Sequence, residues 1–295
     1  MSLFDAPHGK RLRYLRLMLA SLRGHGGGFF IPYRYAGDVD REAETAPWLT
    51  EQFEASLPTM QAVLDDMASH RDALSRITKD AAAPAPRWGQ DWFTGFDAAA
   101  YYALIRRHQP KRIVEIGSGH STRFAVQAIR DAGLTTKIDA IDPAPRAVIT
   151  QALSNTVTWH RMTVESLPRY QRPALSAGDI LFIDSSHILM PGTDVDCLFH
   201  DWLPQLPAGV LIHIHDMFLP APYPKHWRWR GYNEQPAVAA LLGTGAYKLV
   251  FASAFLRAQQ SERLTAVSPP VQCPDSALET SLWLEKKKPG DRVSE

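Results

Sequence analysis

The chain has little cysteine and almost no net charge. Its 295 residues include only two cysteines, Cys197 and Cys273, which form neither a CxxC pair nor a disulfide framework. A reducing compartment, the cytoplasm, is therefore the expected location. The formal net charge is +1, so the chain as a whole exerts no pull toward nucleic acid.

Long hydrophobic runs are also missing. The first apolar stretch, residues 12–22, contains Arg13 and Arg16 and is too short and too charged to span a bilayer. We expect no transmembrane segment and no secretory signal. The stretch is typical of a basic amphipathic helix, which either packs on its own protein or lies on a membrane surface.

Apolar residues make up 45% of the chain, enough for a sizeable core. Residues 1–95 lack strand alternation. Helical spacing there predicts helices at 10–23, before a glycine run, and at 48–79, where Pro58 kinks or breaks the helix. We therefore expect a helical N-terminal extension over 1–95 and a charged tail over 287–295.

The middle of the chain alternates between short apolar strands and helices. This pattern predicts βαβ units and a parallel sheet, which is a doubly wound α/β fold. The expected strands are 112–116, 137–141, 157–160, 179–183 and 210–215. The expected helices are 96–108, 121–132, 144–153, 195–206 and 234–242. Two final strands are expected at 247–252 and 281–285.

The segment RIVEIGSGHSTRFAV, residues 112–126, predicts a strand, a glycine turn and a helix start. Gly117 and Gly119 let the backbone approach a ligand, and Ser121 or Thr122 is expected to cap the helix. A dinucleotide is disfavoured because Thr122 replaces the third glycine of GxGxxG. In addition, the Glu115 carboxylate would repel a pyrophosphate.

Asp142 ends the next predicted strand, in the sequence KIDAIDP. An acid at this place can accept hydrogen bonds from both ribose hydroxyls of a nucleoside ligand. The alternative is that Asp142 only caps the turn after Pro143.

These motifs, with VESL, DILFIDSSH and LPAGVLIHIHD further along the chain, resemble class I S-adenosylmethionine-dependent methyltransferases. Within that class, residues 96–286 look most like the bacterial branch related to catechol O-methyltransferase. The resemblance implies a seven-stranded, mostly parallel Rossmann-like sheet that is closed by the antiparallel pair 247–252 and 281–285. It implies S-adenosylmethionine as cofactor, with the methionine end at Glu115, Gly117 and Ser118, the ribose at Asp142 and the adenine near Glu165 and Ser166.

Two further predicted strand ends carry acids and histidines. Asp184 and His187 follow one strand, and His215 and Asp216 follow the next, so we expect these four side chains to converge at one edge of the sheet. His213 points to the same face as His215 but lies deeper. Such a cluster can hold a divalent cation or supply a general base.

Three roles stay open for this cluster. The resemblance implies that acids at Asp184 and Asp216 hold magnesium. However, Met217 stands where the family has an amide, so His215 would have to complete the metal site. Without a metal, His215 or His187 would act as base and Asp184 would orient the acceptor. In the third case Asp184 and His187 only hydrogen-bond the cofactor and a neighbouring loop.

The stretch PYPKHWRWRGYNEQ, residues 222–235, interleaves aromatic and basic side chains beside the expected acceptor pocket. It suits a flat acceptor that is anionic or sugar-like. An aromatic lid or a subunit contact explains the composition equally well. Stacking combined with phosphate contact is also one way to bind single-stranded nucleic acid.

The sequence thus predicts transfer of a methyl group from S-adenosylmethionine to a hydroxyl oxygen of a small molecule, by an enzyme that is a candidate homo-oligomer. Two other functions stay open: an NAD-dependent oxidoreductase on a similar fold, and a non-catalytic cofactor-binding protein.

Overall fold

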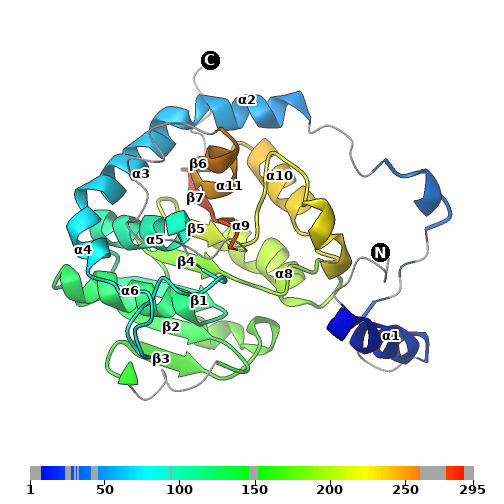
Figure 1. Cartoon of the computed structure of the whole chain (residues 1–295), viewed down its shortest axis with the longest axis horizontal. Helices are drawn as coiled ribbons and strands as arrows, with labels where there is room; N and C mark the ends of the chain where they lie inside the picture. Colours follow the sequence, from blue (N-terminus) through cyan, green and yellow to red (C-terminus); the bar gives the residue numbers. More distant parts are fainter. Residues whose placement is uncertain are drawn as a thin grey trace.

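The computed structural model describes residues 8–23, 28–29, 31, 33–40, 46–93, 95–145, 152–259 and 277–288. Within these residues seven strands form one sheet in the order β3-β2-β1-β4-β5-β7-β6 (Figure 1). The strands are β1 Arg112–Ile116, β2 Lys137–Ile141, β3 Val157–His160, β4 Ile180–Ile183, β5 Leu211–Ile214, β6 Tyr247–Ala252 and β7 Leu282–Lys286.

The sheet confirms the predicted fold class. Strands β1 to β5 pair in parallel, and β7 pairs antiparallel with both β5 and β6. Both β4 and β5 are buried along their whole length, as expected for central strands that are covered on both faces. The chain order reverses beside β1, which has β2 on one side and β4 on the other. Ligands of such sheets bind in the crevice at this point.

The helices around the sheet also follow the prediction closely. They are α5 Gly95–His108, α6 His120–Asp131 and α10 Gln235–Gly243, with shorter turns η3 Val164–Ser166 and η4 Arg169–Gln171. The helix predicted at 195–206 is α8 Asp194–Cys197, η5 Leu198–Trp202 and α9 Leu203–Gln205 in direct succession. The middle part is a π-helix that precedes Pro204, a residue without the N–H that regular α-helical bonding requires.

Some expectations fall outside the described residues or were missed. The helix predicted at 144–153 falls mostly on residues 146–151, outside the described part. Cys273, most of the glycine run and residues 289–295 of the expected tail also lie outside it. Helix α11 Ser253–Ala258 was not predicted, because its six residues are too few to establish a helical period.

The N-terminal region separates into two parts. Helices α2 Pro47–Ala55, α3 Leu57–Ser69 and α4 Arg71–Ser75 replace the predicted helix 48–79, and the break at Ser56, just before Pro58, was expected. Buried residues such as Phe53 and Met60 join the same apolar cluster as the sheet. Helix α1 His8–Leu22 stands apart from them, beyond α10, followed by the turn η2 Ala36–Asp38 (Figure 1).

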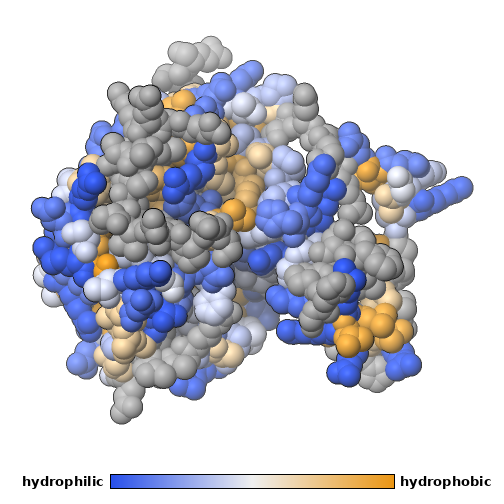
Figure 2. Space-filling view, viewed as in Figure 1, coloured by the Kyte–Doolittle hydropathy of each residue, from blue (hydrophilic) through white to orange (hydrophobic). Residues whose placement is uncertain are grey.

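Helix α1 keeps an apolar surface toward solvent. Leu12, Leu15 and Leu19 are exposed, and Figure 2 shows an apolar patch at the position of this helix. Among the described residues, no helix has the length and apolar character required to cross a bilayer.

Candidate active site

The turn after β1 requires glycine at one position. Gly117 has a φ of +80°, and a Cβ atom there would lie 2.4 Å from the carbonyl oxygen of Asp184. Both facts exclude a larger side chain, because this conformation and this approach suit glycine alone. The backbone therefore turns beside the end of β4, where the crevice opens.

The start of α6 differs in detail from the prediction. Gly119 is the N-cap residue, so Ser121 and Thr122 lie inside the helix, and the prediction that one of them caps it is wrong. The hydroxyl of Thr122 instead accepts a hydrogen bond from the Gly119 N–H, at 3.0 Å. A hydroxyl at the third helical position can reach back to the N-cap backbone in this way.

Glu115 lies beneath the turn. Its side chain has no exposed surface, and Thr122 donates a hydrogen bond to its Oε2 atom at 2.6 Å. Its Oε1 atom has no hydrogen-bond partner among the described residues. Burial raises the pKa of Glu115 to about 7, although hydrogen bonds from Ser121 and Thr122 oppose the shift.

Asp142 lies across the crevice at the end of β2. Ser118 donates from its hydroxyl to Asp142 Oδ2 at 2.6 Å, and the Ala144 N–H donates to Oδ1 at 2.8 Å. The carboxylate thus caps the turn after Pro143, one of the two roles considered for it. It also lines the main cavity, so the ribose role stays a prediction.

One cavity of about 1990 Å³ connects these residues to the ends of β4 and β5. Of the expected cofactor contacts, it is lined by Gly117, Ser118, Gly119, Asp142, Glu165 and Asp184. Glu115 and Ser166 are not part of the lining; the Ser166 hydroxyl donates instead to the Thr163 carbonyl at 2.8 Å. The volume exceeds the range of about 300–1,000 Å³ typical for a single drug-sized ligand, so the cavity has room for two ligands.

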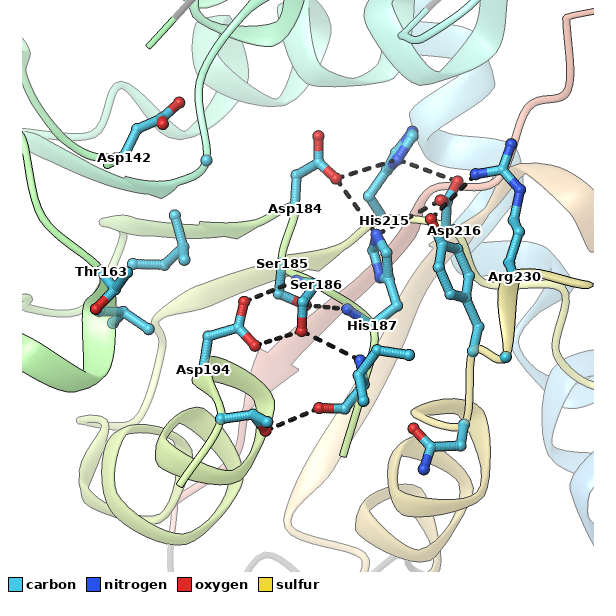
Figure 3. Close-up of a pocket in the computed structure, with 18 of the residues that line it drawn as sticks. Asp142, Thr163, Asp184, Ser185, Ser186, His187, Asp194, His215, Asp216 and Arg230 are labelled. Atoms are coloured by element: carbon cyan, nitrogen blue, oxygen red, sulfur yellow. Dashed lines mark hydrogen bonds and ion pairs between the residues drawn. The ribbon is translucent and has the colours of Figure 1, made fainter. Parts of the chain in front are cut away.

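The four side chains expected at the sheet edge do converge (Figure 3). Nε2 of His187 lies 3.5 Å from Asp184 Oδ1 and 3.5 Å from Asp216 Oδ2. Nδ1 of His215 lies 3.3 Å from Asp216 Oδ1 and 3.8 Å from Asp184 Oδ1. The two carboxylates are therefore interleaved with two imidazoles, which relieves their mutual repulsion.

Burial and neighbouring charges shift the pKa values of these side chains in opposite directions. Burial alone would lower the pKa of His215, but the charges of Asp216, Asp184 and Asp97 raise it to about 9. The pKa of His187 is likewise raised well above its usual value by its carboxylate partners, against the effect of burial. Desolvation of the partly exposed Asp184 opposes its ionisation, yet the His187 hydrogen bond and the charge of His215 lower its pKa to about 2.

Two buried carboxylates behind the imidazoles were missed by the sequence analysis. Oε2 of Glu234 lies 2.9 Å from Nδ1 of His187, and Oδ2 of Asp97 lies 3.6 Å from Nε2 of His215. Both acids have no exposed surface. Glu234 is the N-cap residue of α10 and falls in the stretch 222–235, and Asp97 lies in the first turn of α5, but no local pattern indicated that either acid would approach a histidine.

His213 has a different environment from the other two histidines. Its ring stacks on Phe182, with centroids 3.8 Å apart, and its Nε2 lies 2.8 Å from the Ser281 hydroxyl oxygen. Burial lowers its pKa well below the usual value. It is a neutral side chain of the core, deeper than His215 as predicted.

The described residues contain no group of three His, Cys, Asp or Glu side chains arranged to hold a metal ion. The carboxylates of Asp184 and Asp216 contact imidazoles instead. The donor set thus does not fit a metal as it stands, and the expected metal role of Asp184, His215 and Asp216 stays a prediction.

Comparisons with known proteins give a family match for the part of the chain that carries the site. Residues 114–217 match the family model described as a methyltransferase domain, and this match extends from β1 past Asp216. No curated protein matches the chain.

Several solved structures are similar at low identity. One is the SAH-bound Podospora anserina methyltransferase PaMTH1, with 15% identity over 88% of this chain and 100% of that chain, at a TM-score of 0.41. Another is the O-methyltransferase TomG from Streptomyces achromogenes in complex with SAM, with 14% identity over 83% of this chain and 100% of that chain, at a TM-score of 0.42. At such TM-scores they assign neither cofactor nor acceptor to this chain. The family match, by contrast, includes the glycine turn, Asp142 and the acid–histidine cluster, and the chain therefore contains a methyltransferase domain.

Proposed function

We propose that this chain is an S-adenosylmethionine-dependent methyltransferase that methylates a hydroxyl oxygen of a small molecule. The observation that carries the proposal is the single cavity that connects the glycine turn and Asp142 to the cluster of Asp184, His187, His215 and Asp216. One end suits a nucleoside cofactor, and the other end suits proton transfer from an acceptor.

The residues at the first end fit this cofactor. Gly117 and Ser118 would hold its amino-acid end, and Asp142 its ribose, with Glu165 on the same side of the cavity. When bound, S-adenosylmethionine supplies a methyl group on a sulfonium cation. The buried Glu115, whose Oε1 has no partner among the described residues, would in its ionised form stabilise positive charge above the turn and disfavour a pyrophosphate. This argues against the NAD alternative.

We assign to His215 the role of the base that accepts the proton of the acceptor hydroxyl. Its Nδ1 faces Asp184 and Asp216, and Asp97 lies behind its Nε2. Asp184, whose side chain is 47% exposed, would accept a hydrogen bond from the acceptor hydroxyl and orient it. The O–H bond then breaks, the proton passes to neutral His215, and the oxygen is free to accept the methyl group.

The raised pKa of His215 indicates which kind of acceptor hydroxyl this base can deprotonate. Each unit by which the pKa of the base falls below that of the hydroxyl adds about 1.4 kcal/mol to the cost of proton transfer. A phenol has a pKa of about 10, as tyrosine does, and His215 has one of about 9. A phenolic acceptor therefore fits this base better than an aliphatic alcohol.

The test combines binding with turnover. We expect S-adenosylhomocysteine to bind in calorimetry at micromolar concentration, and Asp142→Ala to weaken it by about 1–3 kcal/mol. With S-adenosylmethionine and a panel of phenols, Asp184→Asn and His215→Gln should lower turnover while leaving that binding intact. Repeating the assay with a chelator and with added magnesium decides the metal question. Binding of NAD but not of S-adenosylhomocysteine would overturn the proposal.

A further inference from the structure

The short helix η6 Lys225–Arg230 fixes one cationic side chain at the wall of the cavity. The guanidinium carbon of Arg230 lies 4.0 Å from the ring centroid of Trp227, and 5.4 Å from those of Trp229 and Tyr232. Its Nη1 also donates to the Tyr232 hydroxyl at 3.0 Å. Because aromatic faces attract a guanidinium, these rings hold the group in one place. In Figure 3 it points toward the cluster at Asp216.

Arg230 has no carboxylate partner within the described part of the chain. Asp216, toward which it points in Figure 3, contacts the imidazoles of His187 and His215 instead. The Nε atom of Arg230 is buried and has no hydrogen-bond partner among described residues. A buried cationic donor without a partner costs free energy unless a ligand supplies the acceptor. The cavity wall therefore presents a positive charge whose counter-ion has to come from outside.

A second cation lies on the same wall. Nζ of Lys10, from α1, lies 4.8 Å from the centroid of the Trp229 ring, and both Lys10 and Arg230 line the cavity. At the cavity floor the imidazoles of His187 and His215 offset part of the negative charge of the carboxylates. Negative charge on a ligand is thus favoured at the wall.

Tyr232 contacts both this charge and the acid–histidine cluster. Its ring centroid lies 4.6 Å from that of His187, and its hydroxyl accepts the hydrogen bond from Arg230. The acid–histidine cluster and the guanidinium thus flank a single aromatic side chain. A flat ligand that carries a hydroxyl and an anionic group would meet the cluster, Arg230 and the rings of Trp227 and Tyr232 within one cavity.

Resting on the methyl transfer proposed above, we propose that the acceptor is an aromatic hydroxy acid and that Arg230 binds its carboxylate. The planar fork of a guanidinium matches a carboxylate in geometry and charge. Arg230 would thus decide which phenols are methylated, while His215 and Asp184 act on the hydroxyl.

The experiment compares an acid with its uncharged counterpart. The probes are para-hydroxybenzoate and para-hydroxybenzamide, assayed with S-adenosylmethionine on the full chain. We expect the wild type to prefer the acid by about 10- to 100-fold in kcat/KM, mainly through KM, as charge-assisted hydrogen bonds predict. Arg230→Gln should abolish this preference by weakening use of the acid alone, and Arg230→Lys should restore part of it.

Arg228→Gln is the matched control, because Arg228 lies on the same helix but does not line the cavity; it should keep the preference. Equal use of acid and amide by the wild type, or an equal loss for both in Arg230→Gln, would overturn the proposal. Calorimetry on the chain saturated with S-adenosylhomocysteine tests the anion site separately from the proposed methyl transfer. Acid binding that Arg230→Gln removes supports the anion site even without turnover, and no acid binding to the wild type overturns it.

Discussion

Nδ1 of His187 lies 2.9 Å from Oε2 of Glu234, a carboxylate without exposed surface. Such a pair fixes the orientation of the imidazole, so that Nε2 faces the two aspartates of the cluster. Burial raises the pKa of Glu234, while its contact with His187 opposes the shift. Each partner therefore stabilises the buried charge of the other, which would be costly without it.

We expect Glu234→Gln to lower kcat by about 10- to 100-fold, in the range seen when a carboxylate behind a functional histidine is removed. Affinity for S-adenosylhomocysteine, measured by calorimetry, should be unchanged, since Glu234 does not line the cavity. Glu54→Gln, on the exposed side of α2, controls for loss of one negative charge. Unchanged kcat in Glu234→Gln would show that the pair has only a structural role.

The rate should depend on pH through His215. Because the imidazole must be neutral to accept a proton and its pKa is about 9, kcat/KM should rise about tenfold per pH unit from pH ~7 and level off above pH ~9. His215→Gln should remove this dependence. A profile that levels off near pH ~6.5 would mean that the surrounding aspartates do not raise the pKa of the base.

Stability should fall as pH rises through the titration of Glu115. Its pKa is raised from 4.5 to about 7 in the folded chain, so the folded state holds a proton that the unfolded state releases. Below pH ~4.5 both states are protonated. Between pH ~4.5 and ~7 the free energy of unfolding should drop, by about 3 kcal/mol in total. Urea denaturation of wild type and Glu115→Gln tests this: the variant should lack that fall, and parallel curves would contradict the assignment.

The two parts of the N-terminal region should respond differently to truncation. Removing residues 1–46 takes away α1, which lines the acceptor side of the cavity with Lys10, Tyr14 and Leu17. Cooperative unfolding and cofactor binding should persist, while KM for the acceptor rises. Removing residues 1–95 also takes away α2–α4, whose buried apolar residues belong to the main core, so the remainder should be poorly soluble. A soluble and fully active remainder would mean that 1–95 is a separate extension.

Much of the fold could be predicted because its strands are short apolar runs between helices and turns. β1, β2, β3 and β6 begin and end at the predicted residues. The convergence of Asp184 and His215 could also be predicted, because parallel neighbouring strands bring their ends to one edge. Asp97 and Glu234 could not, since their approach to the histidines depends on how whole helices pack. The N-cap at Gly119 was misplaced because the Thr122 hydroxyl bonds backward to the N-cap backbone.

The hydrogen bonds of Asp97 connect the active site to the end of the sheet that is made last. Its carboxylate accepts hydrogen bonds from the N–H groups of Thr280 and Ser281, which lead directly into β7, and from the hydroxyl of Ser253. The acid behind His215 is therefore held by nearly the last described segment of the chain. A polypeptide emerging from the ribosome can assemble the glycine turn early, yet His215 gains its full surroundings only after β7 inserts between β5 and β6. We therefore expect methyltransferase activity to appear only after β7 has joined the sheet, so that activity also measures the completion of folding.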